Sequence, residues 1–313
     1  MIIVTGGAGF IGSNLIEALN ARGDHEIIVV DRSTDSSNLA NLRISDFMQP
    51  DEFRGAIVSD ALPPRIEAIF HQGACADTTN DDRAYMMDNN FTFSKEVLHF
   101  AVARRIPLVY ASSAAVYGAS TTFAPTPENE RPLNLYGISK LAFDNHVREI
   151  AASSESVVAG LRYFNVYGPR ESHKGKMASM VYQLYRQLVA NGRARLFTGT
   201  DGYADGEQRR DFVFVGDVVR VNLALAEGPA RSGIFNVGTG QSRSFNEVAR
   251  TIVERIGAGA IEYVQFPENL AGRYQSFTQA DLSGLRAAGY SEKFSSLEDG
   301  IAKSVAAWDL EQL

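Results

Sequence analysis

The sequence predicts an α/β fold in which helices cover both faces of a parallel sheet, the doubly wound arrangement. Short runs of β-branched and apolar residues alternate with helical stretches through the first half of the chain. These runs are continuously apolar, which is typical of strands buried on both faces. A glycine-rich turn also follows the first run directly and opens a helix, as a strand-turn-helix unit requires.

The elements can be placed in chain order. A helix is expected over 10–23, directly after the glycine turn, and another over 133–147. A third helix over 180–192 should stop at Asn191 and Gly192, which is a common helix ending. Loop-rich segments at 167–179 and 198–210 mark a smaller second region. The expected strands are 2–6, 26–31, 67–74, 107–113 and 156–164.

Composition excludes several classes of protein. The 313 residues are 45% hydrophobic, enough for a large core, and 30 basic against 37 acidic residues leave a net charge of -7. This balance argues against the broad basic face that binds nucleic acid. Cys75 is the only cysteine, the chain opens as a strand rather than a signal peptide, and no apolar run approaches the roughly 20 residues that span a bilayer. We therefore expect a cytoplasmic protein without membrane contact.

The glycine turn predicts a dinucleotide site. In TGGAGFIG, the residues Gly6, Gly9 and Gly12 follow the first strand and begin a helix, and Phe10 and Ile11 lie between them. Glycine permits the tight turn and lets backbone amides approach a pyrophosphate, which the positive end of the helix also attracts. The motif alone is weak, because glycine turns also simply join strands to helices. The order of strand, turn, helix, strand and acid strengthens it.

The residues after the second strand bear on the choice of cofactor. Asp31 ends that strand, about 20 residues downstream of the glycine turn, where an acid accepts hydrogen bonds from the adenosine ribose. A free 2′-hydroxyl suits Asp31 and favours NAD. Arg32 is able to clasp a 2′-phosphate and would favour NADP, although an exposed turn residue is an equally good interpretation of Arg32. These residues alone therefore do not decide between NAD and NADP.

A second group of residues predicts redox chemistry on an alcohol. Ser113 ends a strand at the sheet edge where ligands bind, and Tyr136 and Lys140 are four residues apart on one helix face. A nearby cation lowers the pKa of a phenol, so Lys140 is expected to bring Tyr136 closer to neutral pH. Ser113 would hold the reacting oxygen while Tyr136 exchanges its proton. Singly, each residue has an ordinary structural interpretation.

Two levels of family resemblance follow from these motifs. TGGAGFIG, ASSAAVYG, RYFNVYGPR and the pair Tyr136 and Lys140 resemble the extended branch of the short-chain dehydrogenase/reductase superfamily. The segments FHQGACADTT, YMMDNN, YFNVYGPRESHKGKMAS, RRDFVFVGDV, GIFNVGTG and GRYQSFTQADL more closely resemble the ADP-glycero-manno-heptose 6-epimerase family, nearly end to end.

The resemblance implies roles for individual residues. It implies Ser113, Tyr136 and Lys140 as the redox triad and Lys174 as a second catalytic residue. It also implies NADP as cofactor, with NAD as the alternative, although two positions where the family carries lysines hold Asn38 and Pro50 here. Further cofactor contacts would come from Asn38, Gln72, Gly73, Ala74, Cys75, Ala76, Asn89, Tyr136 and Lys140. Substrate contacts would come from Asn165, Lys174, Lys176, Phe197, Thr200, Arg210 and Tyr274.

The residues after Ser113 help to choose the reaction. Sugar-nucleotide dehydratases resemble this chain but carry an acidic pair where Ala114 and Ala115 stand, so elimination lacks its acid and base. Epimerisation by transient oxidation to a ketone then requires the sugar to turn, and Lys174 in its glycine-containing loop is a candidate second proton exchanger. Attraction of the diphosphate is the alternative for Lys174. The substrate implied is an ADP-heptose epimerised at carbon 6, as in lipopolysaccharide core precursor synthesis.

Two other functions remain open from the sequence. One is a UDP-hexose 4-epimerase or another nucleotide-sugar oxidoreductase, and the other is a dinucleotide-sensing regulator without turnover. No histidine or acidic spacing predicts a metal. Arg273 is expected to pair with the ADP phosphates alongside Arg210, and the resemblance implies a homo-oligomer, by analogy a pentamer.

The two regions are expected to interleave along the chain. We expect a dinucleotide-binding Rossmann domain at 1–166 and 211–238, with about 284–305 as a candidate addition. The substrate-binding α/β domain would occupy 167–210 and 239–283.

Overall fold

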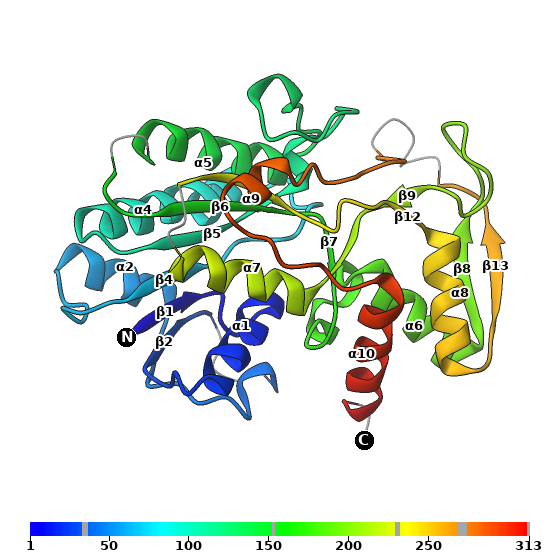
Figure 1. The fold of residues 1–313 in the computed structure, drawn as a ribbon, viewed down its shortest axis with the longest axis horizontal. Coiled ribbons are helices and arrows are strands. Elements are labelled where there is room, and N and C mark those ends of the chain that lie inside the picture. Colours follow the sequence, from blue (N-terminus) through cyan, green and yellow to red (C-terminus); the bar gives the residue numbers. More distant parts are fainter. Residues whose placement is uncertain (33–36, 152–153, 229–231, 268–273, 312–313) are drawn as a thin grey trace.

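A parallel sheet forms the larger half of the molecule (Figure 1). The computed structural model describes residues 1–32, 37–151, 154–228, 232–267 and 274–311, and within them seven strands run in the order β11-β6-β5-β4-β1-β2-β3. This confirms the predicted fold class. The strands are β1 Ile2–Thr5, β2 Ile27–Val30, β3 Asp46–Met48, β4 Ala68–His71, β5 Leu108–Ser113, β6 Val158–Tyr163 and β11 Gly233–Val237.

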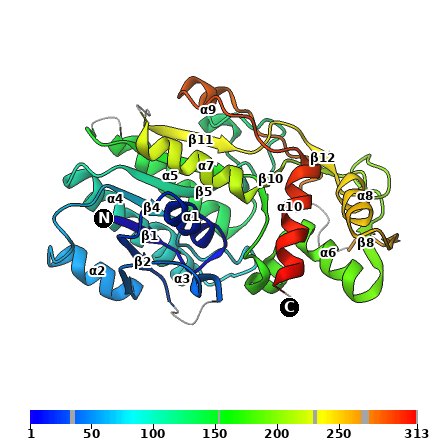
Figure 2. The same cartoon turned by 60° about the horizontal axis from the view of Figure 1, so that its bottom comes forward.

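Helices cover both faces of this sheet because successive strand side chains point to opposite sides. Ile2 and Val4 of β1 pack in one cluster with Leu15 of α1, and Ile3 packs in another with Val97 of α4. Figure 2 shows α1 and α7 together in front of the strands. The helices are α1 Phe10–Ala21, α2 Pro50–Val58, α3 Arg83–Met87, α4 Phe93–Ala103, α5 Leu135–Ala151, α6 Met180–Asn191, α7 Val215–Glu227, α8 Phe245–Ile256, α9 Ser283–Ala287 and α10 Leu297–Leu310.

A smaller region beside the sheet is built from short strand pairs and three helices. Helix α6 ends at Asn191 with Gly192 in the left-handed conformation, which confirms the predicted stop. Side chains of α6, α8 and α10 share a third apolar cluster, in which Tyr185 and Trp308 stack at a 5.0 Å centroid distance. The strand pairs are β7 Asn165–Tyr167 with β10 Phe212–Phe214, β8 Arg193–Phe197 with β13 Ala260–Val264, and β9 Arg209–Arg210 with β12 Arg243–Ser244.

The division into a dinucleotide-binding and a substrate-binding domain stays a proposal, to which the packing adds detail. Within 284–305, Leu285 packs in the cluster of α1 and α7, whereas Leu297 and Ile301 pack in the third cluster.

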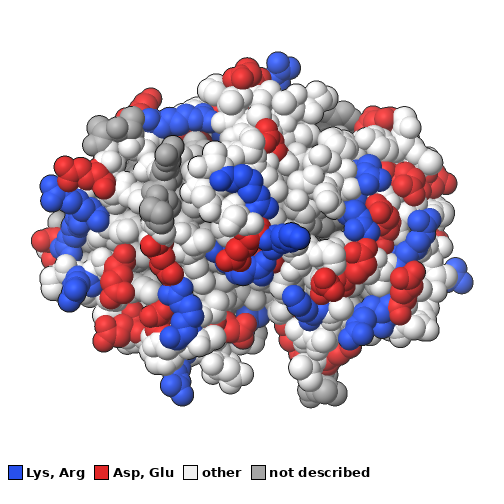
Figure 3. Space-filling view, in the orientation of Figure 1, with Lys and Arg blue, Asp and Glu red and all other residues white. Residues whose placement is uncertain are grey.

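Lysine, arginine and acidic side chains are interspersed on the face drawn in Figure 3. No helix in the described part of the chain is long and apolar enough to cross a membrane.

Candidate active site

The glycine turn between β1 and α1 depends on two close backbone approaches. Gly6 has a φ of +67°, and a Cβ there would lie 2.6 Å from the Gly73 nitrogen. A Cβ on Gly12 would lie 2.2 Å from the Gly6 carbonyl oxygen. Gly9 stands at the N-cap of α1 and has no side chain to cover the first helical N–H groups. The turn is therefore shaped as a cradle for a phosphate group.

This turn forms one wall of a cleft of about 290 Å³. Asn38 and Cys75 are not part of its lining: the Asn38 amide donates to the Ala8 carbonyl (3.1 Å), and the Cys75 N–H donates to Asn90 Oδ1 (2.7 Å). His173, from the loop after β7, also lines this cleft. The predicted cofactor residues in the lining are Gly6, Gly9, Phe10, Ile11, Gly12, Asp31, Arg32, Gln72, Gly73, Ala74, Ala76 and Asn89.

Asp31 and Arg32 have different surroundings at the rim of this cleft. The Asp31 carboxylate accepts hydrogen bonds from the backbone N–H of Ala8 (2.9 Å) and of Arg32 (2.7 Å), so it braces the glycine turn. The Arg32 guanidinium donates to the Tyr85 hydroxyl and to Asn89 Oδ1 and lies 5.2 Å from the Tyr85 ring centre. Both of these partners are uncharged, and no carboxylate of the described residues is paired with the Arg32 guanidinium.

Ser113, Tyr136 and Lys140 meet where β5 ends against α5. The Ser113 side chain lies close enough to the Tyr136 phenol to lower its pKa, and the Lys140 ammonium donates to the Ala111 carbonyl (2.8 Å). Cys75 lies close to both Tyr136 and Lys140 and raises the pKa of each. None of the three predicted catalytic side chains is among the residues that line the dinucleotide cleft, but Cys75 lies between the lining residues Ala74 and Ala76.

The electrostatics of this group differ from the expectation. Burial raises the pKa of Tyr136 and outweighs the lowering effect of the Ser113 hydroxyl. Burial also lowers the pKa of Lys140 to about 8, against the raising effects of Asp144 and Cys75. The lowering of the Tyr136 pKa expected from its spacing to Lys140 is therefore not found, because desolvation of the phenol dominates.

Lys174 is carried by a short 3₁₀ segment, Ser172–Met177, that folds against the glycine turn. Its ammonium lies 5.1 Å from the centre of the Phe10 ring in the dinucleotide cleft, and burial lowers its pKa while Glu171 raises it. The buried Glu171 carboxylate accepts from the N–H groups of Gly168 (3.0 Å) and Ser179 (2.6 Å). One carboxylate thus joins the two ends of the loop that carries Lys174.

A second cleft of about 250 Å³ lies in the smaller region. Arg210, 8% exposed, lies between two rings, 4.8 Å from the centre of Tyr274 and 5.8 Å from that of Phe245. The predicted substrate residues in the lining are Asn165, Phe197, Arg210 and Tyr274. A buried guanidinium between aromatic rings is suited to bind a nucleotide phosphate or base.

Some of the predicted substrate residues are not found in this lining, and several lining residues were not predicted. Lys176 and Thr200 are not part of the second lining, and Arg273 lies outside the described residues. Phe245 was missed, since it only begins a helix after the Ser244 cap and approaches Arg210 through the tertiary fold. Other missed lining residues are Met180, Arg195, Leu196 and Gln208. Among described residues, no group of three or more potential ligands is arranged for a metal.

A chain of hydrogen bonds behind the cleft fixes the tautomer of His71. Gly73 N–H donates to Thr5 Oγ1 (3.1 Å), which lies 2.7 Å from His71 Nδ1. His71 Nε2 lies 2.9 Å from Ser94 Oγ, which itself donates to the Asn90 carbonyl. Nε2 must therefore carry the proton and Nδ1 must accept. Burial, with a smaller effect from Lys140, lowers the pKa of His71 to about 3.

Comparisons with known proteins bear on this site. The chain matches the model of the NAD dependent epimerase/dehydratase family over residues 2–238. It is similar to ADP-L-glycero-D-manno-heptose-6-epimerase of Alkalilimnicola ehrlichii, with 55% identity over 304 residues that cover 96% of this chain and 95% of that protein.

Two solved structures are also similar to this chain over nearly its full length. The crystal structure of ADP-L-glycero-D-manno-heptose-6-epimerase of Helicobacter pylori matches with a TM-score of 0.85 and 33% identity, covering 97% of this chain and 95% of that one. UDP-glucose 4-epimerase of Thermus thermophilus, in complex with NAD, matches with a TM-score of 0.79 and 27% identity, covering 98% of each chain.

The state of His71 predicts how stability depends on pH. Its folded pKa of about 3 lies below the ordinary value of 6.5, so the unfolded chain binds more protons between these values and stability falls as pH is lowered through this window. His71→Asn should remove this dependence, which has a slope of up to about 1.4 kcal/mol per pH unit. Chemical denaturation of both proteins across the window measures it, and parallel pH profiles would contradict the assignment.

Proposed function

The chain belongs to the NAD dependent epimerase/dehydratase family, and from this we propose that it is an isomerase acting on an ADP-heptose. It inverts carbon 6 of the heptose and converts ADP-D-glycero-D-manno-heptose into ADP-L-glycero-D-manno-heptose. The observation that carries this proposal is the 55% identity, over 96% of the chain, to a relative named for that reaction.

The cleft beside the glycine turn fits a nicotinamide dinucleotide. Gly6, Gly9 and Gly12 would hold its pyrophosphate, because side chains at Gly6 and Gly12 would fill the cradle. Asp31 and Arg32 would face the adenosine half, and Gln72–Ala76 would border the nicotinamide half. When bound, the nicotinamide reversibly accepts a hydride from the substrate.

Tyr136 handles the proton of the carbon 6 hydroxyl. The phenolate takes this proton as the alcohol becomes a ketone, and the phenol returns it when the ketone is reduced. Burial favours the phenol, and the Ser113 hydroxyl favours the phenolate. Ser113 holds the same oxygen through its hydroxyl.

Inversion requires the ketone to present its other face, and Lys174 serves as the second proton exchanger. It is half-buried, its pKa is lowered, and it lines the dinucleotide cleft. Elimination is disfavoured, because Ala114 and Ala115 follow Ser113 directly and carry no ionisable group.

We also propose NADP as the cofactor, a cytoplasmic location and a homo-oligomeric assembly, a pentamer by family resemblance. The charge of Arg32 at the cleft rim supports NADP, since a guanidinium binds a phosphate through paired hydrogen bonds. Arg54 lies in a neighbouring pocket and is already paired with Asp88 and Glu96. It therefore has no unpaired charge to offer a cofactor phosphate.

Product analysis tests the proposed reaction. We expect the protein to convert ADP-D-glycero-D-manno-heptose without net accumulation of reduced nicotinamide, and to leave UDP-glucose unchanged, as judged by mass and stereochemistry of the products. Tyr136→Phe should reduce turnover by about 10²- to 10⁴-fold with cofactor binding intact. Tyr182→Phe, which removes a hydroxyl beside Arg186 on α6, is the matched control. Full activity of Tyr136→Phe would remove Tyr136 from the chemistry.

A second prediction concerns Lys174. Lys174→Ala should stall epimerisation yet allow a single oxidation of one epimer, seen as a transient rise in reduced nicotinamide absorbance. Lys95→Ala is a matched control, because the ammonium groups of Lys95 and Lys174 both lie 5.1 Å from a phenylalanine ring centre. Weaker substrate binding with an unchanged rate at saturation would instead assign Lys174 to the diphosphate.

A third prediction concerns Arg32 and cofactor choice. Arg32→Ala should raise the Kd for NADP by about 10- to 100-fold, the loss of charge-assisted hydrogen bonds, and change the Kd for NAD little. Fluorescence titration with both cofactors measures this, with Arg54→Ala as the control. An equal rise in the Kd values for NADP and NAD would show that Arg32 does not bind the 2′-phosphate.

A further inference from the structure

Helix α5 carries two of the three catalytic side chains, and its position against β5 is set one turn further along by Asp144. This carboxylate is fully buried. Its Oδ1 accepts a hydrogen bond from the Tyr110 hydroxyl (3.0 Å), and its Oδ2 accepts from the Ser112 hydroxyl (2.9 Å) and from Arg162 Nε (2.9 Å). Two of these donors belong to the strand that ends at Ser113.

Lys140 completes the attachment of α5 to β5. Its ammonium donates to the carbonyl of Ala111, which lies between Tyr110 and Ser112. Two side chains one turn apart on α5 therefore bind three successive residues of β5, immediately before Ser113. A shift of the helix by one residue, about 1.5 Å along its axis, would break all of these bonds. The distance between Ser113 and Tyr136 is thereby set.

The attachment needs space that only a glycine provides. Gly160 of β6 pairs with Tyr110 of β5 in the sheet, and a Cβ on Gly160 would lie 2.3 Å from the Tyr110 hydroxyl. The hydroxyl cannot move aside without leaving Asp144. A close approach of this kind between strand and side chain is a specific use of glycine inside a sheet.

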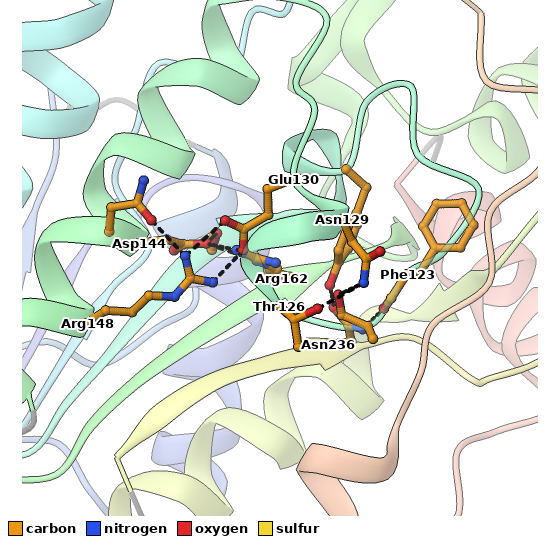
Figure 4. Close-up of polar contacts among 12 residues, drawn as sticks. Phe123, Thr126, Asn129, Glu130, Asp144, Arg148, Arg162 and Asn236 are labelled. Atoms are coloured by element: carbon orange, nitrogen blue, oxygen red, sulfur yellow. Dashed lines mark hydrogen bonds and ion pairs between the residues drawn. The ribbon is translucent and has the colours of Figure 1, made fainter.

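The charge of Asp144 is balanced on the side away from Lys140. Arg162 is fully buried and binds both Asp144 (2.8 Å) and Glu130 (2.5 Å), and Arg148 binds Glu130 in turn. Figure 4 shows Glu130 between the two guanidinium groups. Buried ion pairs add little net stability over apolar packing, so stability alone does not explain this network.

We propose that Asp144 is a positioning residue for Ser113, Tyr136 and Lys140, which holds the catalytic helix in register with β5 and presents a negative charge to Lys140. The effect on catalysis rests on the proposed epimerase function. The raising effect of Asp144 on the Lys140 pKa, which burial lowers to about 8, supports the proposal. Cys75, from the segment after β4, also raises this pKa, and His71 of β4 interacts with Lys140.

The test compares two variants that each remove one negative charge beside Arg162. Asp144→Asn keeps the shape of the side chain but should lower the pKa of Lys140, so the alkaline limb of kcat/KM should move to lower pH by about one unit. At pH 8, kcat should fall by about fivefold while KM changes little, because the protonated fraction of Lys140 falls from about one half to about one eleventh. Glu130→Gln should lower the Tm but leave the alkaline limb in place, since Glu130 is not among the groups that shift the Lys140 pKa.

An unmoved alkaline limb in Asp144→Asn, with only a lower Tm, would overturn the proposal and leave Asp144 a purely structural residue. If that variant does not fold, Tyr110→Phe keeps the charge and removes one bond of the attachment. It should lower kcat severalfold, and an unchanged kcat would equally overturn the proposal. The Lys140 pKa measured by ¹⁵N NMR needs no substrate, so it tests the charge effect even if wild-type protein fails to epimerise ADP-heptose.

Discussion

The active site depends on the direct contact of two backbone segments at the carboxyl end of the sheet. Gly6, in the turn after β1, lies against Gly73, in the segment after β4, with no room for a side chain between them. This contact brings the helix N-terminus of α1 beside residues 72–76, and the Thr5 to His71 hydrogen bond secures it from behind. The dinucleotide cleft and the residues beside Tyr136 are thus parts of one rigid arrangement.

Much of this arrangement could be predicted from sequence because its signals are local. Continuous apolar runs identify strands buried on both faces, the spacing of Gly6, Gly9 and Gly12 identifies the turn, and four-residue spacing places Tyr136 and Lys140 on one helix face. Each signal lies within about a dozen residues. The family resemblance then extended the interpretation to substrate and reaction, which local pattern alone left open among several nucleotide-sugar enzymes.

What sequence could not predict arises from tertiary contact. Phe245 reaches Arg210 only because β12 pairs with β9, a pairing between two-residue strands that has no periodicity to detect. The pKa of Tyr136 follows from how completely the fold removes water from the phenol, and a spacing argument contains no measure of burial. Likewise, Asp144 has no motif of its own, and its importance appears only when Tyr110, Ser112 and Arg162 surround it.

The contact between Gly160 and the Tyr110 hydroxyl has a consequence for how this sequence can evolve. A larger residue at position 160 is incompatible with the phenol at position 110, and loss of the phenol alone leaves Asp144 short of a donor and an empty space beside the helix. A substitution at either position is unfavourable as long as the other residue is unchanged. Substitutions at 110 and 160 should therefore be inherited as a pair across descendants of this chain.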